Sequence, residues 1–412
     1  MITFDMRSST ITIAKQLRWR KLMRFLICLV ASTILAAANM PIAEAKTQLK
    51  IATFLPENTD RVKKMLAAAD EIDVRTEGRV TFKFYYGGSQ GGDDKVLYKL
   101  KIGQLHGSTF SPAALQKPYP DINIYGLPFI FESEEEVDYV RKFMDAKFQR
   151  GLEEAGFVNF GFAGADFAMV LSNEPIRSHN DLKGKKFWVP EGDVFTYEAM
   201  KALDLTPIPF EIANVLTGLQ TGLIDIVAIP PAGALLFQWH TKVKYVTRMP
   251  IIFTMHFMVI DVKAFKKIDA SDQAIVREVM GRLYAELDAA ERKEAPKALQ
   301  ALINSGIESV EPHPGEFEKL RAATAKANRS MANRDMFSSE LLEEMLLHVQ
   351  EYRREQASRD KIACTQSGNE KGAGEQVVAT TEADDRKSGD MDACDSAANE
   401  MEPDGQASVS ES

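Results

Sequence analysis

Cysteine is almost absent from this 412-residue sequence: its three copies stand at positions 28, 364 and 394, all toward the two ends. The central part, about 310 residues long, therefore has no thiol nucleophile and no disulfide, so its stability must come from packing alone. A segment of that length is expected to form two lobes rather than a single core.

The sequence also lacks the motifs of common catalytic and metal sites. None of the six histidines belongs to a His-x-x-x-His or Glu-x-x-His pair, so no metal site is predicted. There is no Gly-x-Ser-x-Gly elbow, and the glycine-rich stretch 87–92 matches neither nucleotide-binding pattern; we interpret it as a turn before a helix rather than as a phosphate site. Basic residues interleaved with aromatics are missing too, which disfavours nucleic acid as a partner. We therefore expect neither an enzyme nor a cofactor.

The first 45 residues have the three parts of a secretory signal. A basic segment precedes an apolar run at 25–38, and Ala43-Glu44-Ala45 offers the small residues that signal peptidase recognises. The run is shorter than the ~20 residues that a membrane-spanning helix needs, which disfavours the alternative of an uncleaved anchor. We predict a cleaved signal peptide, residues 1–45, and a periplasmic mature protein that starts near Lys46.

Acidic charge is concentrated at the other end. From Ser358 onward, 13 Asp or Glu residues stand against five Lys or Arg, which gives −8 of the formal net charge of −9. Few aromatic or long aliphatic residues accompany them, so this segment cannot bury enough apolar area to offset the entropy lost on ordering. We predict that residues 357–412 form a disordered acidic tail.

Strand and helix patterns alternate through the central part, which predicts α/β layers around a mainly parallel sheet. The expected strands are 49–54, 80–85, 107–110, 168–172, 187–189, 224–229 and 255–261. The expected helices are 61–75, 95–102, 194–202, 214–221 and 337–356. A longer helix opens at Ser271-Asp272 and runs to about Asn304, with a break or kink at Pro296.

Four stretches, in this order, resemble the solute-binding subunits of tripartite ATP-independent periplasmic (TRAP) transporters over residues 48–356. They are GSQGGD at 88–93 with GQLH at 103–106, GLPFIF at 126–131, PI at 175–176 before DLKGKK at 181–186, and LQTGLID at 219–225. The resemblance implies a two-lobe periplasmic-binding-protein fold whose long hinge-spanning helix accompanies closure around a small ligand, usually an organic acid. We assign residues 46–168 plus 258–300 to lobe I and residues 169–257 plus 301–356 to lobe II.

The sequence departs from the resembled family where the ligand is expected. Typical members hold a carboxylate with an arginine in the strand after 181–186, and that position here is Trp188. A second arginine often assists from the preceding strand, but residues 166–169 contain none, and Ala228-Ile229-Pro230 replaces a polar turn. Without a guanidinium fork, a pocket of Trp and Phe is poorly suited to a desolvated carboxylate. We therefore predict a largely apolar ligand.

The candidate ligand-binding residues are mainly aromatic: Trp188, Phe167, Phe129, Glu191, Phe253, Phe257, Trp239 and Phe54. Trp188 is the strongest candidate because it occupies the family's ligand position. Glu191 would favour a cationic or hydroxyl-bearing ligand. The phenylalanines taken singly, and Trp239, equally fit a core or a lobe surface, since buried aromatics are common.

The predicted function is capture of a small, largely apolar ligand and its delivery to a TRAP-type membrane permease. Two alternatives stay open: binding of an organic acid, and a periplasmic carrier or receptor that passes its ligand to a sensor or an accessory protein. An exported hydrolase is disfavoured, because residues 46–356 offer no activated nucleophile that the sequence identifies.

Overall fold

The computed structural model describes residue 23 and residues 46–374. The predicted signal peptide, with its cleavage site after Ala45, and residues 375–412 of the predicted acidic tail lie outside the described residues. The first part of that predicted tail, residues 357–374, belongs to a helix. The unit that contains the described strands and helices begins at Thr47. None of the helices described there is long and apolar enough to cross a bilayer.

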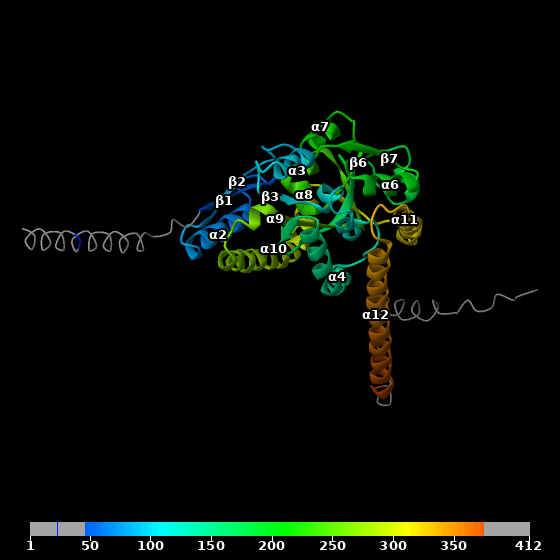
Figure 1. The fold of residues 1–412 in the computed structure, drawn as a ribbon. Helices are drawn as coiled ribbons and strands as arrows, with labels where there is room; N and C mark the ends of the chain where they lie inside the picture. The colour runs from blue at the N-terminus through cyan, green and yellow to red at the C-terminus, as the bar shows by residue number, and fades with distance from the viewer. Residues whose placement is uncertain (1–22, 24–45, 375–412) are drawn as a thin grey trace, which may run out of the picture. The chain divides into compact units, whose positions relative to one another are not determined.

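The strands form a ten-stranded mixed sheet, with its longest path in the order β2-β1-β3-β9-β5-β8-β6-β7. Figure 1 shows β1, β2 and β3 close together, and β6 beside β7. The pairs among β1, β2 and β3 and those among β6, β7 and β8 are parallel, whereas β9 runs antiparallel to both β3 and β5. The strands are β1 (Thr47–Ala52), β2 (Val80–Tyr85), β3 (Gly107–Phe110), β4 (Phe157–Asn159), β5 (Ala163–Ser172), β6 (Lys186–Pro190), β7 (Thr206–Phe210), β8 (Ile226–Ile229), β9 (Tyr245–Asp261) and β10 (Glu308–Val310).

The helices begin where the sequence supplies side-chain caps. Thr59, Ser133 and Asp193 accept hydrogen bonds from the first-turn amides of α2, α4 and α6, which satisfies donors that a helix start leaves free. The helices are α2 (Asp60–Arg75), α3 (Asp93–Lys101), α4 (Glu134–Glu154), α5 (His179–Leu182), α6 (Val194–Ala202), α7 (Val215–Gln220), α8 (Pro231–Leu236), α9 (Val262–Phe265), α10 (Ala270–Asn304), α11 (Glu316–Asn333) and α12 (Ser339–Gly374), with 3-10 turns η1 (Pro112–Leu115), η2 (Pro120–Gly126), η3 (Ile212–Asn214) and η4 (Trp239–Lys242).

Separate buried clusters define the two lobes. The first cluster joins β1–β3 to α2, α4 and most of α10, through residues such as Ile51, Met65 and Leu283. The other two clusters lie around β5–β8, through residues such as Val189 and Val227. The predicted two-lobe α/β fold is confirmed by this arrangement and by the likeness to solved structures described below.

The predicted hinge-spanning helix is also confirmed. α10 is 35 residues long and contributes Leu283 to the first cluster and Leu302 to a lobe II cluster. Pro296 does not break it. That proline lies on an exposed face, where the carbonyl that loses its helical donor can bond to water instead.

The second hinge element, β9, is 17 residues long, much longer than the strand expected at 255–261. Pro250 hid its first half, because proline cannot donate to a sheet ladder. Pro250 lies where the pairing of β9 with β5 is irregular. Ala168 pairs with Ile252 but Val170 pairs with Thr247, so residues 248–251 of β9 have no regular partner in β5.

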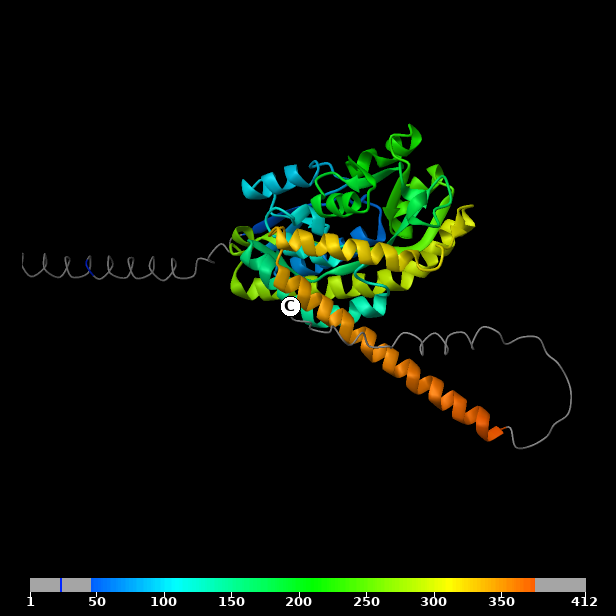
Figure 2. The ribbon, with the colours of Figure 1, turned by 90° about the vertical axis from the view of Figure 1, so that its right-hand side faces the viewer.

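The C-terminal helix α12 ends later than we predicted, and it packs on lobe I instead of lobe II. α12 continues to Gly374 instead of ending near residue 356, and no glycine or proline interrupts residues 357–367. Its buried side chains Leu342, Met345 and Val349 belong to the first cluster, whereas our segment assignment placed them in lobe II. The reason is α4, an amphipathic helix that we did not predict and that packs against α12. Figure 2 shows α12 starting beside the end of α11.

Candidate functional site

A cavity of about 240 Å³ lies between the two lobes. Lobe I contributes η1 and η2, lobe II contributes β6, α6 and β8, and the hinge strands β5 and β9 close it. It is lined by Ser111, Pro112, Ala113, Asn123, Gly126, Ala168, Phe187, Trp188, Pro190, Asp193, Phe195, Thr196, Met200, Ile212, Ala228, Ile229, Pro230, Ile251, Ile252, Phe253, Thr254 and Met255. Most of this surface is apolar, and none of these described residues is Lys, Arg or His.

Trp188 is held rigidly in the cavity wall. Its indole nitrogen donates a hydrogen bond to the carbonyl of Phe210 at 3.0 Å. Its ring packs edge-on against Trp239, with centroids 5.0 Å apart, a geometry that aromatic pairs favour. Only 6% of the residue is exposed. Ala168, which belongs to the stretch where a second arginine is expected, lines the same cavity.

The other predicted residues lie at different depths. Phe253 lines the cavity. Phe167 packs edge-on against Phe253, with the two ring centroids 5.6 Å apart. Three more are in the hydrophobic core and outside the lining: Phe129, Phe257 and Trp239. Glu191 is exposed and Phe54 is half-buried, and neither lines the cavity. The structure therefore brings Trp188 and Phe253 to the cavity surface and leaves the other six behind or beside it.

Sequence reasoning missed the only charged group of the lining, Asp193. Its Oδ1 accepts a hydrogen bond from the amide of Thr196 at 3.0 Å, so it caps α6. Burial among apolar atoms raises the pKa of this carboxyl, against the effect of its hydrogen bonds with Thr196. An Asp directly before the helix expected at 194–202 is a capping signal, but nothing local indicates that it faces a cavity.

Gln116 connects lobe I to the loop that carries Asp193. Its amide nitrogen donates to the carbonyl of Gly192, and its amide oxygen accepts from the backbone nitrogen of Val194 at 3.2 Å. Gln116 follows η1, whose Ala114 and Leu115 belong to the first cluster. This pair of hydrogen bonds therefore crosses from one lobe to the other at the cavity.

Replacing Gln116 with alanine is expected to loosen this crossing. Each lost hydrogen bond contributes about 0.5–1.5 kcal/mol, so the amide of Val194 should exchange its hydrogen about 3–10-fold faster in hydrogen–deuterium exchange. Global stability should change little, because the freed backbone groups are solvent-accessible. Gln104→Ala, at an exposed position outside the cavity lining, is the matched control. Equal exchange in both variants would contradict the role of Gln116.

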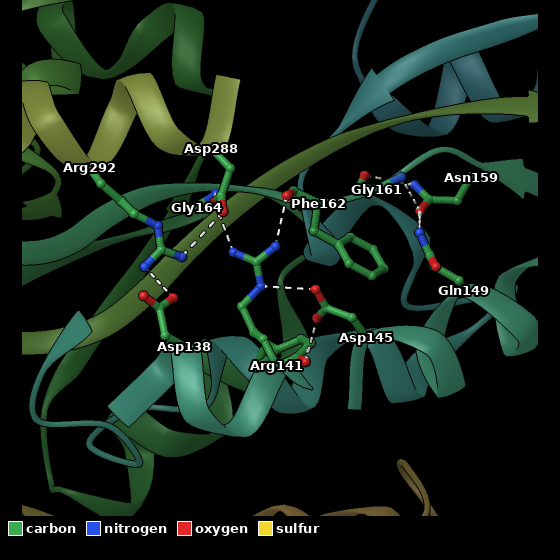
Figure 3. A network of polar contacts seen from close by, with 11 residues as sticks. Asp138, Arg141, Asp145, Gln149, Asn159, Gly161, Phe162, Gly164, Asp288 and Arg292 are labelled. Carbon is green, nitrogen blue, oxygen red and sulfur yellow. Dashed lines mark hydrogen bonds and ion pairs between the residues drawn. The ribbon is translucent and has the colours of Figure 1, made fainter. Parts of the chain in front are cut away.

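A largely buried ionic network joins α4, the long helix α10 and the strand β5 (Figure 3). Arg141 on α4 contacts Asp145 at 3.0 Å and Asp288 of α10 at 2.8 Å, and it donates to the carbonyl of Phe162 at 2.8 Å. Asp288 also accepts from the backbone nitrogen of Gly164 at 2.7 Å. Burial alone would lower the pKa of Arg141, but the two carboxylates outweigh it and raise that pKa. The guanidinium therefore stays charged and joins α4, α10 and β5.

Asp166 is a strained residue of the hinge strand. It has a φ of +114° next to a register shift in β5, and its carboxylate accepts from the amide of Phe167 at 2.6 Å. Burial, with a smaller contribution from Glu134, raises the pKa of Asp166 to about 6. A raised carboxyl pKa destabilises the folded state at neutral pH, because the unfolded chain ionises more readily.

Asp166→Asn is therefore expected to stabilise the protein at neutral pH. The folded state holds the proton of Asp166 up to about pH 6, whereas the unfolded chain loses it near the ordinary value of 3.8. The difference in unfolding free energy between the variant and the wild type should grow between about pH 4 and 6. Above pH 6 it should stay constant, at about 1–2 kcal/mol after allowance for solvent screening. Urea unfolding at several pH values measures it, with exposed Asp70→Asn as control. A gain that is the same at pH 4 and pH 7 would rule this explanation out.

Comparison with known proteins identifies the family of this chain. Residues 51–335 match the family model of bacterial extracellular solute-binding protein, family 7. A C4-dicarboxylate-binding periplasmic protein of Rhodobacter capsulatus is 22% identical over 73% of this chain and 88% of its own length. A TRAP periplasmic solute-binding protein of Ralstonia eutropha with bound (S)-2-acetolactate superimposes with a TM-score of 0.68, at 22% identity, over 74% of this chain and 99% of that one.

A second solved structure shows the same fold. The TRAP periplasmic solute-binding protein of Xanthobacter autotrophicus with bound β-D-galacturonate superimposes with a TM-score of 0.67 at 20% identity. The matched region covers 73% of this chain and 99% of that one. At these identities the solved structures establish the fold, and the family model, which spans well over half of the chain, establishes the family. The chain belongs to family 7 of the bacterial extracellular solute-binding proteins, the solute-binding subunits of TRAP transporters.

Proposed function

We propose that this solute-binding protein is exported to the periplasm, captures a small and largely apolar ligand between its lobes, and delivers it to a TRAP-type membrane permease. One observation carries the choice of ligand: the described lining of the interlobe cavity contains no cationic side chain and has Asp193 as its one charged group. Trp188 and Ala168 occupy the region where we expect an acid-binding member to have arginines.

The energetics of the cavity favour apolar contact. A carboxylate moved from water into a site without a counter-charge loses several kcal/mol of hydration. Apolar surface, by contrast, gains about 25 cal/mol for each Å² removed from water. The rings of Trp188, Phe187 and Phe253 line the cavity and offer such surface without a change of rotamer at Trp188, whose indole is already fixed by Phe210.

Binding of an organic acid is the second candidate, and the relatives favour it. The proteins compared above are named for a C4-dicarboxylate or carry bound acetolactate or galacturonate, and a relative from Vibrio cholerae is named for sialic acid. In this chain an acid would depend on neutral donors, such as the hydroxyl of Ser111 and the second amide hydrogen of Asn123, instead of a guanidinium. That arrangement gives weaker hydrogen bonds than a charge-assisted pair.

Native mass spectrometry of the protein purified from the periplasm tests the proposal. We expect an added mass that is released on denaturation and belongs to a compound without a carboxylate. A co-purified dicarboxylate or sugar acid would establish the second candidate instead. The same spectrum of the intact chain measures whether residues 1–45 have been removed.

A further inference from the structure

Three hydrogen-bond donors of the described cavity lining are already used within the protein, whereas the hydroxyl of Ser111 has no side-chain hydrogen bond among the described residues. The indole nitrogen of Trp188 donates to the carbonyl of Phe210, and the hydroxyl of Thr254 donates to the carbonyl of Asp166 at 2.9 Å. The amide nitrogen of Asn123 donates to the carbonyl of Pro120 at 3.0 Å. Trp188 has no acceptor to offer a ligand, whereas Thr254 and Asn123 still offer oxygen lone pairs.

Asp193 is the strongest of these acceptors. Its Oδ1 caps α6 through the amide of Thr196 at 3.0 Å, and the Thr196 hydroxyl and the amide of Phe195 also donate to this carboxyl. No ion pair of Asp193 is found among the described residues, and its pKa is raised by burial without a contribution from any neighbouring charge. A carboxylate has about four lone-pair positions, so these three hydrogen bonds leave about one position unused at the cavity wall.

We propose that Asp193 receives a hydrogen-bond donor of the ligand, a hydroxyl or an ammonium group, so that the ligand is an amphipathic molecule with a donor head and an apolar body. This inference rests on the proposed function, since it places the polar head of that ligand. The loop of Asp193 is the one that Gln116 holds to lobe I, so the head group binds where the two lobes meet.

The size of the cavity limits the apolar body. Its volume of about 240 Å³ exceeds the roughly 150 Å³ of an engineered apolar cavity that accepts benzene. One six-membered ring with a short arm therefore fits, with the ring among Trp188, Phe187 and Phe253 and the arm toward Asp193. A compound of this size makes a practical probe even though the natural ligand is unidentified.

The experiment compares four probes that share a phenyl ring and differ in head group: 2-phenylethanol, 2-phenylethylammonium, phenylacetate and ethylbenzene. Dissociation constants are measured by calorimetry on the mature exported chain. The alcohol or the ammonium is expected to bind at least tenfold more tightly than ethylbenzene, because hydrogen bonds to charged groups are the stronger ones. Phenylacetate is expected to bind most weakly.

Two variants of Asp193 distinguish the effect of its charge from the effect of having a side-chain oxygen at the cavity surface. Asp193→Asn keeps a good helix cap but removes the charge, so an ammonium preference should fall at least tenfold and a hydroxyl preference only a few-fold. Asp193→Ser also caps α6 yet withdraws the oxygen from the cavity, so both preferences should disappear. Asp261→Asn is the matched control, because Asp261 caps α9 through the amide of Ala264 and does not line the cavity.

Each other outcome contradicts a definite part of the account. Equal binding of ethylbenzene and the two donors, or a preference that survives in Asp193→Ser, overturns the inference and leaves an apolar ligand in place. Tightest binding of phenylacetate overturns the inference and the proposed apolar ligand together. Binding of none of the four up to millimolar concentration also overturns both.

Discussion

Replacing Arg141 with leucine is expected to lower the free energy of unfolding by about 3–5 kcal/mol. The side chain is only 10% exposed and contacts Asp145 and Asp288. Leucine leaves both carboxylates without their guanidinium in a partly buried site, and it leaves the carbonyl of Phe162 without this donor. Loss of a buried partner costs far more than loss of a surface pair, because the remaining charges keep their desolvation penalty.

Urea unfolding followed by circular dichroism measures this effect. The matched control is Arg329→Leu, since Arg329 and Glu343 form an ion pair in which both side chains are more than half exposed, and exposed pairs contribute about 1 kcal/mol or less. The network also joins α10 to β5, so Arg141→Leu should broaden the distribution of lobe orientations in small-angle X-ray scattering. If both variants lose the same stability, the buried network does not hold α4, α10 and β5 together as we describe.

Trp188→Ala is expected to have the second large effect, on stability and on binding. Truncating a buried tryptophan costs about 3–5 kcal/mol, and here it also removes the edge-on contact with Trp239 and the hydrogen bond to Phe210. The cavity would lose its largest aromatic wall. We expect 2-phenylethanol to bind at least 30-fold more weakly, as measured by calorimetry below the melting temperature of the variant.

Two companion variants distinguish the contribution of Trp188 to ligand affinity from the contribution of the tryptophan packing to stability. Trp188→Phe keeps an aromatic surface and loses only the indole donor, so most of the affinity should be retained. Trp239→Phe changes the fully buried ring behind Trp188 and should reduce stability with little effect on affinity. If Trp188→Ala binds the probe as tightly as the wild type does, the cavity is not the binding site.

The general architecture could be predicted because strand and helix periodicities alternate regularly. The long helix was predicted to begin and end within two residues of α10, since its pattern is uninterrupted except at Pro296. β9 and α4 escaped prediction for different reasons. Pro250 masked the first half of β9. The buried residues of α4, such as Val137, Val140 and Met144, do recur at helical spacing, so this helix was missed although its sequence carries the signal.

The candidate site was predicted less completely, because cavity walls depend on tertiary contacts. Trp188 was identified from its place after the DLKGKK motif, and it does line the cavity. Phe257 lies in the core, because β9 points it at Phe162; a sequence of alternating apolar residues does not reveal which of them faces a void. Asp193 and Ala168 carry no local signal of ligand contact, since one resembles an ordinary helix cap and the other an ordinary strand residue.

A parallel thermal-melt titration of the mature protein with 2-phenylethanol and with succinate tests the central claim most directly. A ligand that binds only the folded state raises the melting temperature as its concentration passes the dissociation constant. We predict a rise with 2-phenylethanol in the millimolar range or below, and none with succinate, because the interlobe cavity offers aromatic walls and no guanidinium. A rise with succinate and none with 2-phenylethanol would contradict the account.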